Sequence, residues 1–314
     1  MSELSSVEIC AGAGGQALGL EQAGFGHEAV VEVDPDACET LRRNRGSAWK
    51  VVEGDVANVD GRAFRRVDLL AGGVPCPPFS VAGKQLGEDD ERDLFPQALR
   101  LVEECVPRAV LLENVRGLGT RRFDSYRAQV CGRLHELGYL TWWQLVQASE
   151  HGVPQLRPRF VLVAMRHPWA ARFRWPQASS APETVGETLA DLMASGGWPG
   201  AAGWARGAAG IAPTVVGGSK KHGGPDLGPS RARASWRQLG VDGLGIADGP
   251  PGPAFPVTAM PKLTTRMVAR LQGFPDSWQF AGRKTAAYRQ VGNAFPPPVA
   301  RALGDAIAGA LRPL

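Results

Sequence analysis

The sequence predicts an α/β fold with a mostly parallel sheet, joined to a smaller and irregular second unit. Short apolar runs alternate with amphipathic segments up to about residue 174, as strands and helices do when they follow each other in turn. From residue 175 to about residue 261 this periodicity fades, and Gly, Pro, Ala and Ser dominate. Tryptophans in that segment favour a packed unit over a disordered insert. They are Trp175, Trp198, Trp204 and Trp236.

The composition is that of a globular chain of ordinary size. With 314 residues, 44% of them hydrophobic, the chain can bury a full core. Its net charge of +4 gives only weak support for a nucleic-acid partner. Five cysteines without paired spacing, and no apolar leader at residues 1–3, argue against a disulfide framework, a zinc ribbon and secretion. No apolar run approaches the roughly 20 residues of a membrane span, so we expect a cytoplasmic protein without a metal ion.

The first strand is predicted at residues 7–10 and leads into a glycine-rich turn, Gly12-Ala13-Gly14-Gly15, followed by a helical pattern. Glycine lets a backbone approach a ligand closely, and the helix N-terminus offers unpaired N–H groups. The spacing departs from the dinucleotide fingerprint, which requires a third glycine after two further residues. The turn alone is therefore weak evidence for a nucleotide-like ligand.

Two more predicted strands end in acidic residues. Glu32 ends an apolar run at residues 29–33, where a carboxylate can accept hydrogen bonds from ribose hydroxyl groups. Asp55 follows residues 51–54 and could accept from an adenine amino group. Each acid alone is more often a solvated loop residue. Three successive strand ends nevertheless favour one shared pocket for an adenosine-containing ligand.

Cys76 lies between prolines, directly after the apolar run at residues 67–73. The prolines fix the backbone, and rigid loops at the carboxyl ends of strands are where open α/β sheets carry out chemistry. Most free cysteines are small buried hydrophobic residues, and that interpretation is favoured for Cys76 taken alone. The strand predicted at residues 109–115 carries Glu113 to the same edge. Together, the two side chains suggest a nucleophile and an acid.

Six motifs occur in an order that resembles the DNA cytosine-5 methyltransferase family of prokaryotic restriction–modification systems. The motifs are Ala11-Gly12-Ala13-Gly14-Gly15, Pro75-Cys76 with Phe79-Ser80, Glu113-Asn114-Val115, Gln155-Leu156-Arg157-Pro158-Arg159, Leu271-Gln272-Gly273-Phe274-Pro275 and Gly292-Asn293. The resemblance covers nearly the whole chain. It implies a Rossmann-like class I methyltransferase fold with a catalytic domain at residues 1–174 and 285–314. Residues 175–284 would form a target-recognition domain.

The resemblance also implies the reaction. The thiolate of Cys76 would add to C6 of a flipped-out cytosine, and Glu113 would contact N3. This addition is needed because C5 of the ring is a poor nucleophile until the ring becomes an enamine. C5 then takes a methyl group from S-adenosyl-L-methionine, leaving S-adenosyl-L-homocysteine. Arg159 is expected to contact the cytosine, and Arg157, two positions earlier on a strand, to face the same side and reach a phosphate or the base.

The remaining site residues also follow from the resemblance. Glu8 stands where aspartate is commoner in the family, and Cys10 stands where the family usually has phenylalanine beside the adenine. Asn293 would complete the cofactor pocket. The expected cofactor-binding residues are Cys10, Ala11, Gly12, Gly14, Gly15, Glu32, Val33, Asp55, Val56, Pro75 and Asn293. The expected DNA-binding residues are Ser80, Gln85, Gln155, Lys220, Lys221, Arg231 and Arg233.

Three segments are expected to organise the substrate and the fold. Residues 81–92 suit a mobile lid over the flipped base, although an ordinary solvated loop has the same composition. Residues 220–237 form a basic stretch containing Trp236 that could hold phosphates and bases. Residues 261–273 are predicted to form a capped helix that ends at glycine, and residues 299–311 an amphipathic helix that returns to the first domain.

Three functions remain open at this point. The leading one is a DNA methyltransferase, acting as a monomer on double-stranded DNA beside a restriction endonuclease for the same site. A tRNA cytosine-5 methyltransferase would use the same site, but the long segment at residues 175–261 favours DNA. A catalytically silent, sequence-specific DNA-binding protein is disfavoured by the intact pair of Cys76 and Glu113. No periodic code in the sequence predicts which bases are read.

Overall fold

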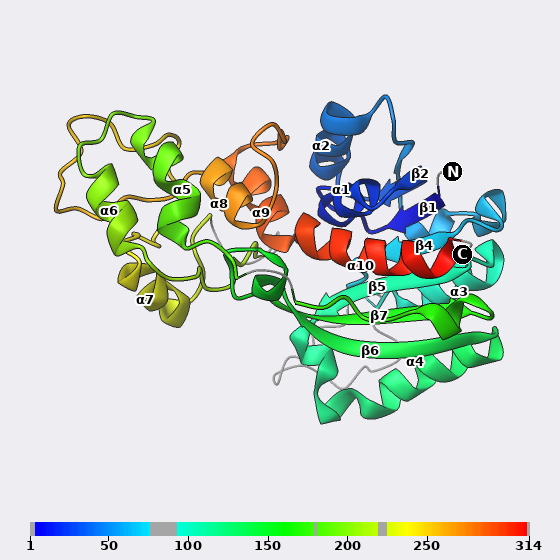
Figure 1. Ribbon diagram of the computed structural model, residues 1–314. Helices are drawn as coiled ribbons and strands as arrows, with labels where there is room; N and C mark the ends of the chain where they lie inside the picture. Colours follow the sequence, from blue (N-terminus) through cyan, green and yellow to red (C-terminus); the bar gives the residue numbers. More distant parts are fainter. Residues whose placement is uncertain (1–3, 76–92, 179–180, 219–224, 313–314) are drawn as a thin grey trace.

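The computed structural model describes residues 4–75, 93–178, 181–218 and 225–312, and its centre is a seven-stranded sheet of order β3-β2-β1-β4-β5-β7-β6 (Figure 1). Neighbouring strands run parallel from β3 to β5, and β7 runs antiparallel to both β5 and β6. The strands are β1 (Leu4–Ile9), β2 (Phe25–Glu32), β3 (Val51–Glu53), β4 (Leu69–Gly72), β5 (Ala109–Val115), β6 (Tyr139–Gln147) and β7 (Pro158–Arg166). The prediction of a mostly parallel sheet is confirmed.

Helices cover both faces of this sheet. The longer ones are α1 (Gly15–Gln22), α2 (Pro35–Arg45), α3 (Phe95–Cys105), α4 (Asp124–Glu136) and α10 (Pro297–Leu311). One apolar core packs α10 against β4, β5 and β7, and a second packs α3 and α4 against the opposite face. Helix α10 lies so close to α1 that a Cβ atom at Gly19 would come within 2.3 Å of the Pro297 carbonyl oxygen. The chain's C-terminal helix therefore returns to the first strands, as predicted.

Single 3-10 turns occupy several of the connections. They are η1 (Val56–Asn58), η2 (Gly61–Phe64), η3 (Arg116–Gly119), η4 (Arg121–Phe123), η5 (Ala148–His151) and η6 (Trp169–Arg172).

Among the described residues, no helix is long and apolar enough to cross a membrane.

A smaller lobe projects from one end of the sheet (Figure 1). Its helices are α5 (Val185–Ala194), α6 (Ala201–Gly207), α7 (Ser230–Gln238), α8 (Thr265–Leu271) and α9 (Lys284–Asn293). Trp198, Trp204 and Trp236 are buried in its apolar core, so this part of the irregular segment is packed. Trp175 instead packs beside Phe173 against the sheet core. The two-domain division with boundaries after residues 174 and 284 stays a prediction.

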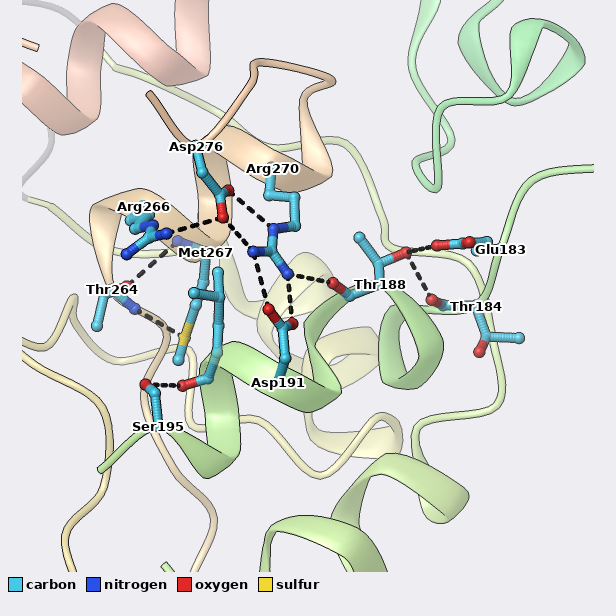
Figure 2. A network of polar contacts seen from close by, with 11 residues as sticks. Glu183, Thr184, Thr188, Asp191, Ser195, Thr264, Arg266, Met267, Arg270 and Asp276 are labelled. Atoms are coloured by element: carbon cyan, nitrogen blue, oxygen red, sulfur yellow. Dashed lines mark hydrogen bonds and ion pairs between the residues drawn. The ribbon is translucent and has the colours of Figure 1, made fainter. Parts of the chain in front are cut away.

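A network of charged side chains ties α5 to α8 in this lobe (Figure 2). Arg270 of α8 forms ion pairs with Asp191 and Asp276, and it donates a 3.0 Å hydrogen bond to the Thr188 carbonyl oxygen. Hydrogen bonds from the Arg270 guanidinium lower the pKa of Asp276 to about 2. The network fixes α8, which begins after its N-cap Thr264 and ends before residue 273, inside the limits predicted for it.

Candidate active site

The carboxyl ends of the parallel strands meet at one edge of the sheet and form a pocket of about 380 Å³. Six of the expected site residues line it: Cys10, Ala11, Gly12, Glu32, Glu113 and Asn293. Further lining residues come from β1, from α1, from the turn after β2 and from α9; they include Glu8, Gln16, Asp34, Arg289 and Gln290. The pocket thus joins segments from both ends of the chain.

The glycine turn after β1 has two separate tasks. Gly12 has a φ of 55°, and a Cβ atom there would meet nothing within 4 Å, so its backbone borders open space in the pocket. Gly14 and Gly15 are not in the pocket lining. A Cβ atom at Gly15 would come within 2.2 Å of the Phe295 carbonyl oxygen. These two glycines therefore allow α1 to pack closely against neighbouring segments.

The carboxylate of Glu32 is held by backbone groups. Its Oε2 accepts a 2.7 Å hydrogen bond from the Gly12 N–H, and Oε1 accepts 2.8 Å bonds from the N–H groups of Val33 and Asp34. Each carboxylate oxygen can accept more than one bond. The arrangement fixes an acceptor at the wall of the pocket, as the binding of ribose hydroxyl groups requires.

Two polar side chains in the pocket wall were not assigned to the site from the sequence. Glu8 is fully buried, and neither of its carboxyl oxygens has a hydrogen-bond partner within normal geometry. Its burial raises the pKa well above the ordinary value, an effect that the nearby Ala17 backbone partly offsets. The amide of Gln16 is also buried without a partner. A glutamate between the apolar residues Val7 and Ile9 of a predicted strand was the available signal for Glu8.

The unpartnered polar atoms of Glu8 and Gln16 indicate what kind of ligand the pocket can hold. Buried polar atoms are normally paired, because an unmade hydrogen bond costs about 1–3 kcal/mol. Beside the fixed carboxylate of Glu32, the pocket therefore offers groups for a ligand that carries hydroxyl, amino and carboxyl functions. S-Adenosyl-L-methionine has this chemistry. Among the described residues, no group of three His, Cys, Asp or Glu side chains is placed to hold a metal ion.

The other expected cofactor residues lie outside the pocket lining. Asp55 is exposed, and its side chain accepts a 2.8 Å hydrogen bond from the Ala57 N–H, capping η1. Val33 is 65% exposed, Val56 is buried, and Pro75 is exposed at the end of the described segment. Cys10 does line the pocket, but burial raises the pKa of its thiol to about 12. Burial therefore favours the neutral thiol form of Cys10.

Glu113 and Arg159 form an ion pair at the same edge. Arg159 Nε lies 2.6 Å from Glu113 Oε1, although the N–H is not aligned for a hydrogen bond. The antiparallel register places Arg159 opposite Val115, two residues beyond Glu113. Asn114 donates a 2.8 Å hydrogen bond to the Val74 carbonyl oxygen, which fixes the chain two residues before Cys76. The expected positions Cys76, Ser80, Gln85, Lys220 and Lys221 lie outside the described residues.

Arg157 differs from the expectation that it shares a face with Arg159. Its side chain is 1% exposed, and its guanidinium donates to the carbonyl oxygens of Val215, Gly292 and Ala294 at 2.7, 2.7 and 2.9 Å. The reason is that Arg157 precedes β7 and turns inward, where carbonyl groups of remote segments need donors. In this structure Arg157 connects the lobes, and it is not itself among the residues that line the pocket, although its partner Ala294 is.

Gln155 was expected to contact DNA but is fully buried. Its Nε2 lies 2.5 Å from Gln272 Oε1, and its Oε1 accepts a 2.9 Å bond from the Val215 N–H. Trp236 is likewise fully buried, so its ring supports the lobe's core and cannot stack on a base. Of the basic stretch, Arg231 is exposed and Arg233 is partly buried, both on α7.

Comparison with known proteins places this chain in a family. A family model for C-5 cytosine-specific DNA methylases matches residues 4–202 and 229–309. The chain is 58% identical to the Type II methyltransferase M.NaeI of Lentzea aerocolonigenes, over 99% of this chain and 76% of that protein. It is 52% identical to the Type II methyltransferase M.NgoMIV of Neisseria gonorrhoeae, over 99% of each.

Solved structures agree at the level of the fold. An E. coli prophage protein described as a DNA modification methyltransferase superposes with a TM-score of 0.70 at 21% identity, covering 98% of this chain and 99% of that one. A Spodoptera frugiperda DNMT2 variant gives a TM-score of 0.69 at 17% identity, covering 97% and 99%. The Rossmann-like methyltransferase fold is thereby confirmed. With the family match and these relatives, the chain belongs to the C-5 cytosine-specific DNA methylase family and is a DNA cytosine-5 methyltransferase.

Proposed function

We propose that this enzyme methylates one cytosine within a short, specific sequence of double-stranded DNA, as the modification partner of a restriction endonuclease. The naming of its relatives as Type II methyltransferases supports this role. The observation that carries the proposal is that the Glu113–Arg159 pair adjoins the 380 Å³ pocket at one sheet edge. We further propose that the enzyme acts as a monomer in the cytoplasm.

Catalysis is assigned to Cys76, Glu113 and Arg159. The Cys76 thiolate adds to C6 of the flipped cytosine, and the electron pair of the C5–C6 double bond becomes available at C5. Glu113 holds a proton at N3, which neutralises the charge that develops on the ring. Arg159 keeps the Glu113 carboxyl group in place. After C5 is methylated, the C5 proton leaves, the thiolate is expelled and the aromatic ring is restored.

The cofactor is assigned to the pocket, where bound S-adenosyl-L-methionine supplies the methyl group. Glu32 would accept from the ribose hydroxyl groups. Asp55, which lies outside the pocket lining, would accept from the adenine amino group if the adenine extends beyond the pocket. Asn293 and Gln16 would hold the amino-acid end, and their positions in the pocket lining, on α9 and α1, support this assignment.

Target recognition is assigned to residues 175–284. Within them, residues 220–237 would carry the discriminating base contacts. Gln155 and Arg157 would not touch DNA; they hold the segment that contains Val215 against the catalytic core. Exchanging residues 220–237 for those of a relative with a different site should change the methylated sequence. If the methylated sequence stayed the same, these residues would not be the discriminating ones.

The test is base-resolution 5-methylcytosine sequencing of DNA from a methylation-free bacterial host that expresses the chain. One short methylated motif is expected, and a Cys76→Ala variant made in equal amount should leave the DNA blank. Unmodified DNA in the presence of soluble wild-type protein would contradict the proposal. Host tRNA would then be examined for 5-methylcytosine.

A further inference from the structure

A second pocket lies at the edge of the sheet opposite to the candidate active site. It has a volume of about 420 Å³ and is lined by Arg65, Arg66, Val106, Arg108, Arg166, His167 and Trp169. Its arginines stand just before β4, just before β5 and at the end of the antiparallel β7. All three positions belong to the edge away from Glu113, and we call this site the basic pocket.

The positive charge of the basic pocket is compensated only in part. Four of its seven lining residues are arginines, and none is acidic. Arg108 pairs with Asp68 at 2.7 Å, whereas Arg65, Arg66 and Arg166 form no ion pair with any carboxylate in the described part of the chain. Surface cations of a folded protein repel each other when they are this concentrated. An anion bound among the three unpaired arginines would offset this repulsion.

The backbone of the basic pocket is held in a sparsely populated conformation. Arg66 has a φ of 70° and Val106 a φ of 51°. Such values are rare for residues other than glycine, and for a β-branched residue they are outliers. A 2.6 Å hydrogen bond from the Arg66 N–H to the Cys105 carbonyl oxygen joins the two turns. Within the described residues, Cys10 is the one other non-glycine residue with a positive φ, and it lines the cofactor pocket.

We propose that the basic pocket binds phosphate groups of a nucleic-acid backbone. Guanidinium groups match phosphate oxygens in geometry and charge. Arg108 is already oriented by Asp68, and its Cζ atom lies 5.0 Å from the centre of the Trp169 ring, so a guanidinium group and not a base occupies this face of the ring. The site therefore reads the backbone and not the bases.

Nucleic acid held in the basic pocket is a different segment from the one being methylated, because the two sites occupy opposite edges of the sheet. A second, sequence-independent contact of this kind would help the enzyme to stay near DNA between encounters with its target. Such contacts are electrostatic, so the affinity falls as salt is added. The fall is steeper when the protein neutralises more phosphates.

The test compares the full-length wild type with Arg66→Gln/Arg166→Gln. The matched control is Arg43→Gln/Arg301→Gln, which removes the same charge from two helical surface arginines paired with Glu39 and Asp305. Binding of the single-stranded oligonucleotide dT12 is measured by fluorescence anisotropy over a range of salt concentrations, and binding of inorganic pyrophosphate by calorimetry. The catalytic cleft contributes equally to all three proteins, so their differences report the basic pocket.

The expected result is at least tenfold weaker dT12 binding for Arg66→Gln/Arg166→Gln than for the control. A plot of log K against the logarithm of the salt concentration should become less steep by about 1.4, which is about 0.7 for each lost arginine. Methylation of a substrate duplex should proceed at the control's rate, which shows that the variant is folded. Equal dT12 binding by the two variants would overturn the proposal. Loss of pyrophosphate binding alone would overturn the assignment to nucleic acid.

Discussion

Arg159 Nε lies 2.6 Å from Glu113 Oε1, and the two side chains are 13% and 12% exposed. The contact joins β5 to β7 at the edge where the pocket opens. In the proposed mechanism the carboxyl group of Glu113 sits against a cytosine ring and needs a fixed position, which the largely buried guanidinium of Arg159 would supply. Arg159 would then act on the reaction through Glu113 as well as through the base itself.

Removing the guanidinium should slow the chemical step. For Arg159→Ala we expect single-turnover methyl transfer to fall about 10²- to 10³-fold, the usual loss for one positioned charged donor in an active site. Arg159→Lys should recover part of the rate, because a positive charge is kept while the planar fork is lost. Rapid-quench measurement of methyl transfer under saturating DNA and cofactor would check this. An unchanged single-turnover rate for Arg159→Ala would show that the ion pair has no part in catalysis.

Arg157 should behave differently from Arg159, because its guanidinium is committed to three carbonyl oxygens. Arg157→Met leaves those groups buried without a donor, and we expect the free energy of unfolding to fall by about 3–5 kcal/mol. Urea unfolding would measure the loss, with Arg43→Met on the surface of α2 as the control. At temperatures where the variant is folded, its DNA affinity should match that of the wild type. Wild-type stability combined with weak DNA binding would favour a direct contact with DNA.

The nucleophile can be separated from substrate binding. Cys76→Ala should abolish methylation while DNA affinity stays largely intact, because the contacts to phosphates and bases are assigned to other residues. Methylation assays and gel-shift titrations on the same preparation would measure both. Residual turnover near the wild-type rate would refute covalent catalysis at Cys76.

Asn293 offers a test of the cofactor pocket. Its side chain lines the pocket, and its Nδ2 donates a 3.3 Å hydrogen bond to the Gly218 carbonyl oxygen. Asn293→Ala should weaken S-adenosyl-L-methionine binding by about five- to tenfold while DNA binding changes little, since one polar contact is worth about 1–1.5 kcal/mol. Calorimetric titration with the cofactor would check this, with Asn44→Ala, outside the pocket, as the control. Equal losses for both ligands would indicate a folding defect.

The buried Glu8 predicts a particular dependence of stability on pH. Burial raises its pKa in the folded state above the unfolded value, so its contribution is fully present below the unfolded pKa and is lost as pH rises towards the folded pKa. Glu8→Gln removes this loss. The variant should therefore gain in unfolding free energy relative to the wild type as pH rises from 4 to 7, by up to about 1.4 kcal/mol per pH unit.

Urea unfolding at several pH values would measure this difference, and Glu28→Gln, an exposed change on β2, is the control. A constant difference between Glu8→Gln and the wild type across this range would mean that Glu8 titrates normally. In that case its carboxyl group would have to find a partner in solution that the structure does not show.

The arrangement of the pocket could be anticipated to a large extent from local patterns. Apolar runs predicted the strands, and the carboxyl ends of parallel strands must share an edge, so Gly12, Glu32 and Glu113 were expected together and do line one pocket. Roles for these residues came from the resemblance to a family and remain proposals. The helix at the C-terminus was predicted because its amphipathic pattern is local.

The tertiary structure decided which charged and aromatic groups stay free to act. Arg157 and Arg159 are two positions apart, yet one meets the carbonyl oxygen of Gly292, 135 positions away, while the other faces Glu113. Trp236 is buried, although its basic neighbours suggested contact with bases. By itself the sequence determined the strands, the turn and the order of the motifs, because these depend on neighbouring residues. Burial and pairing of Arg157, Gln155 and the basic pocket depend on partners brought together only by folding.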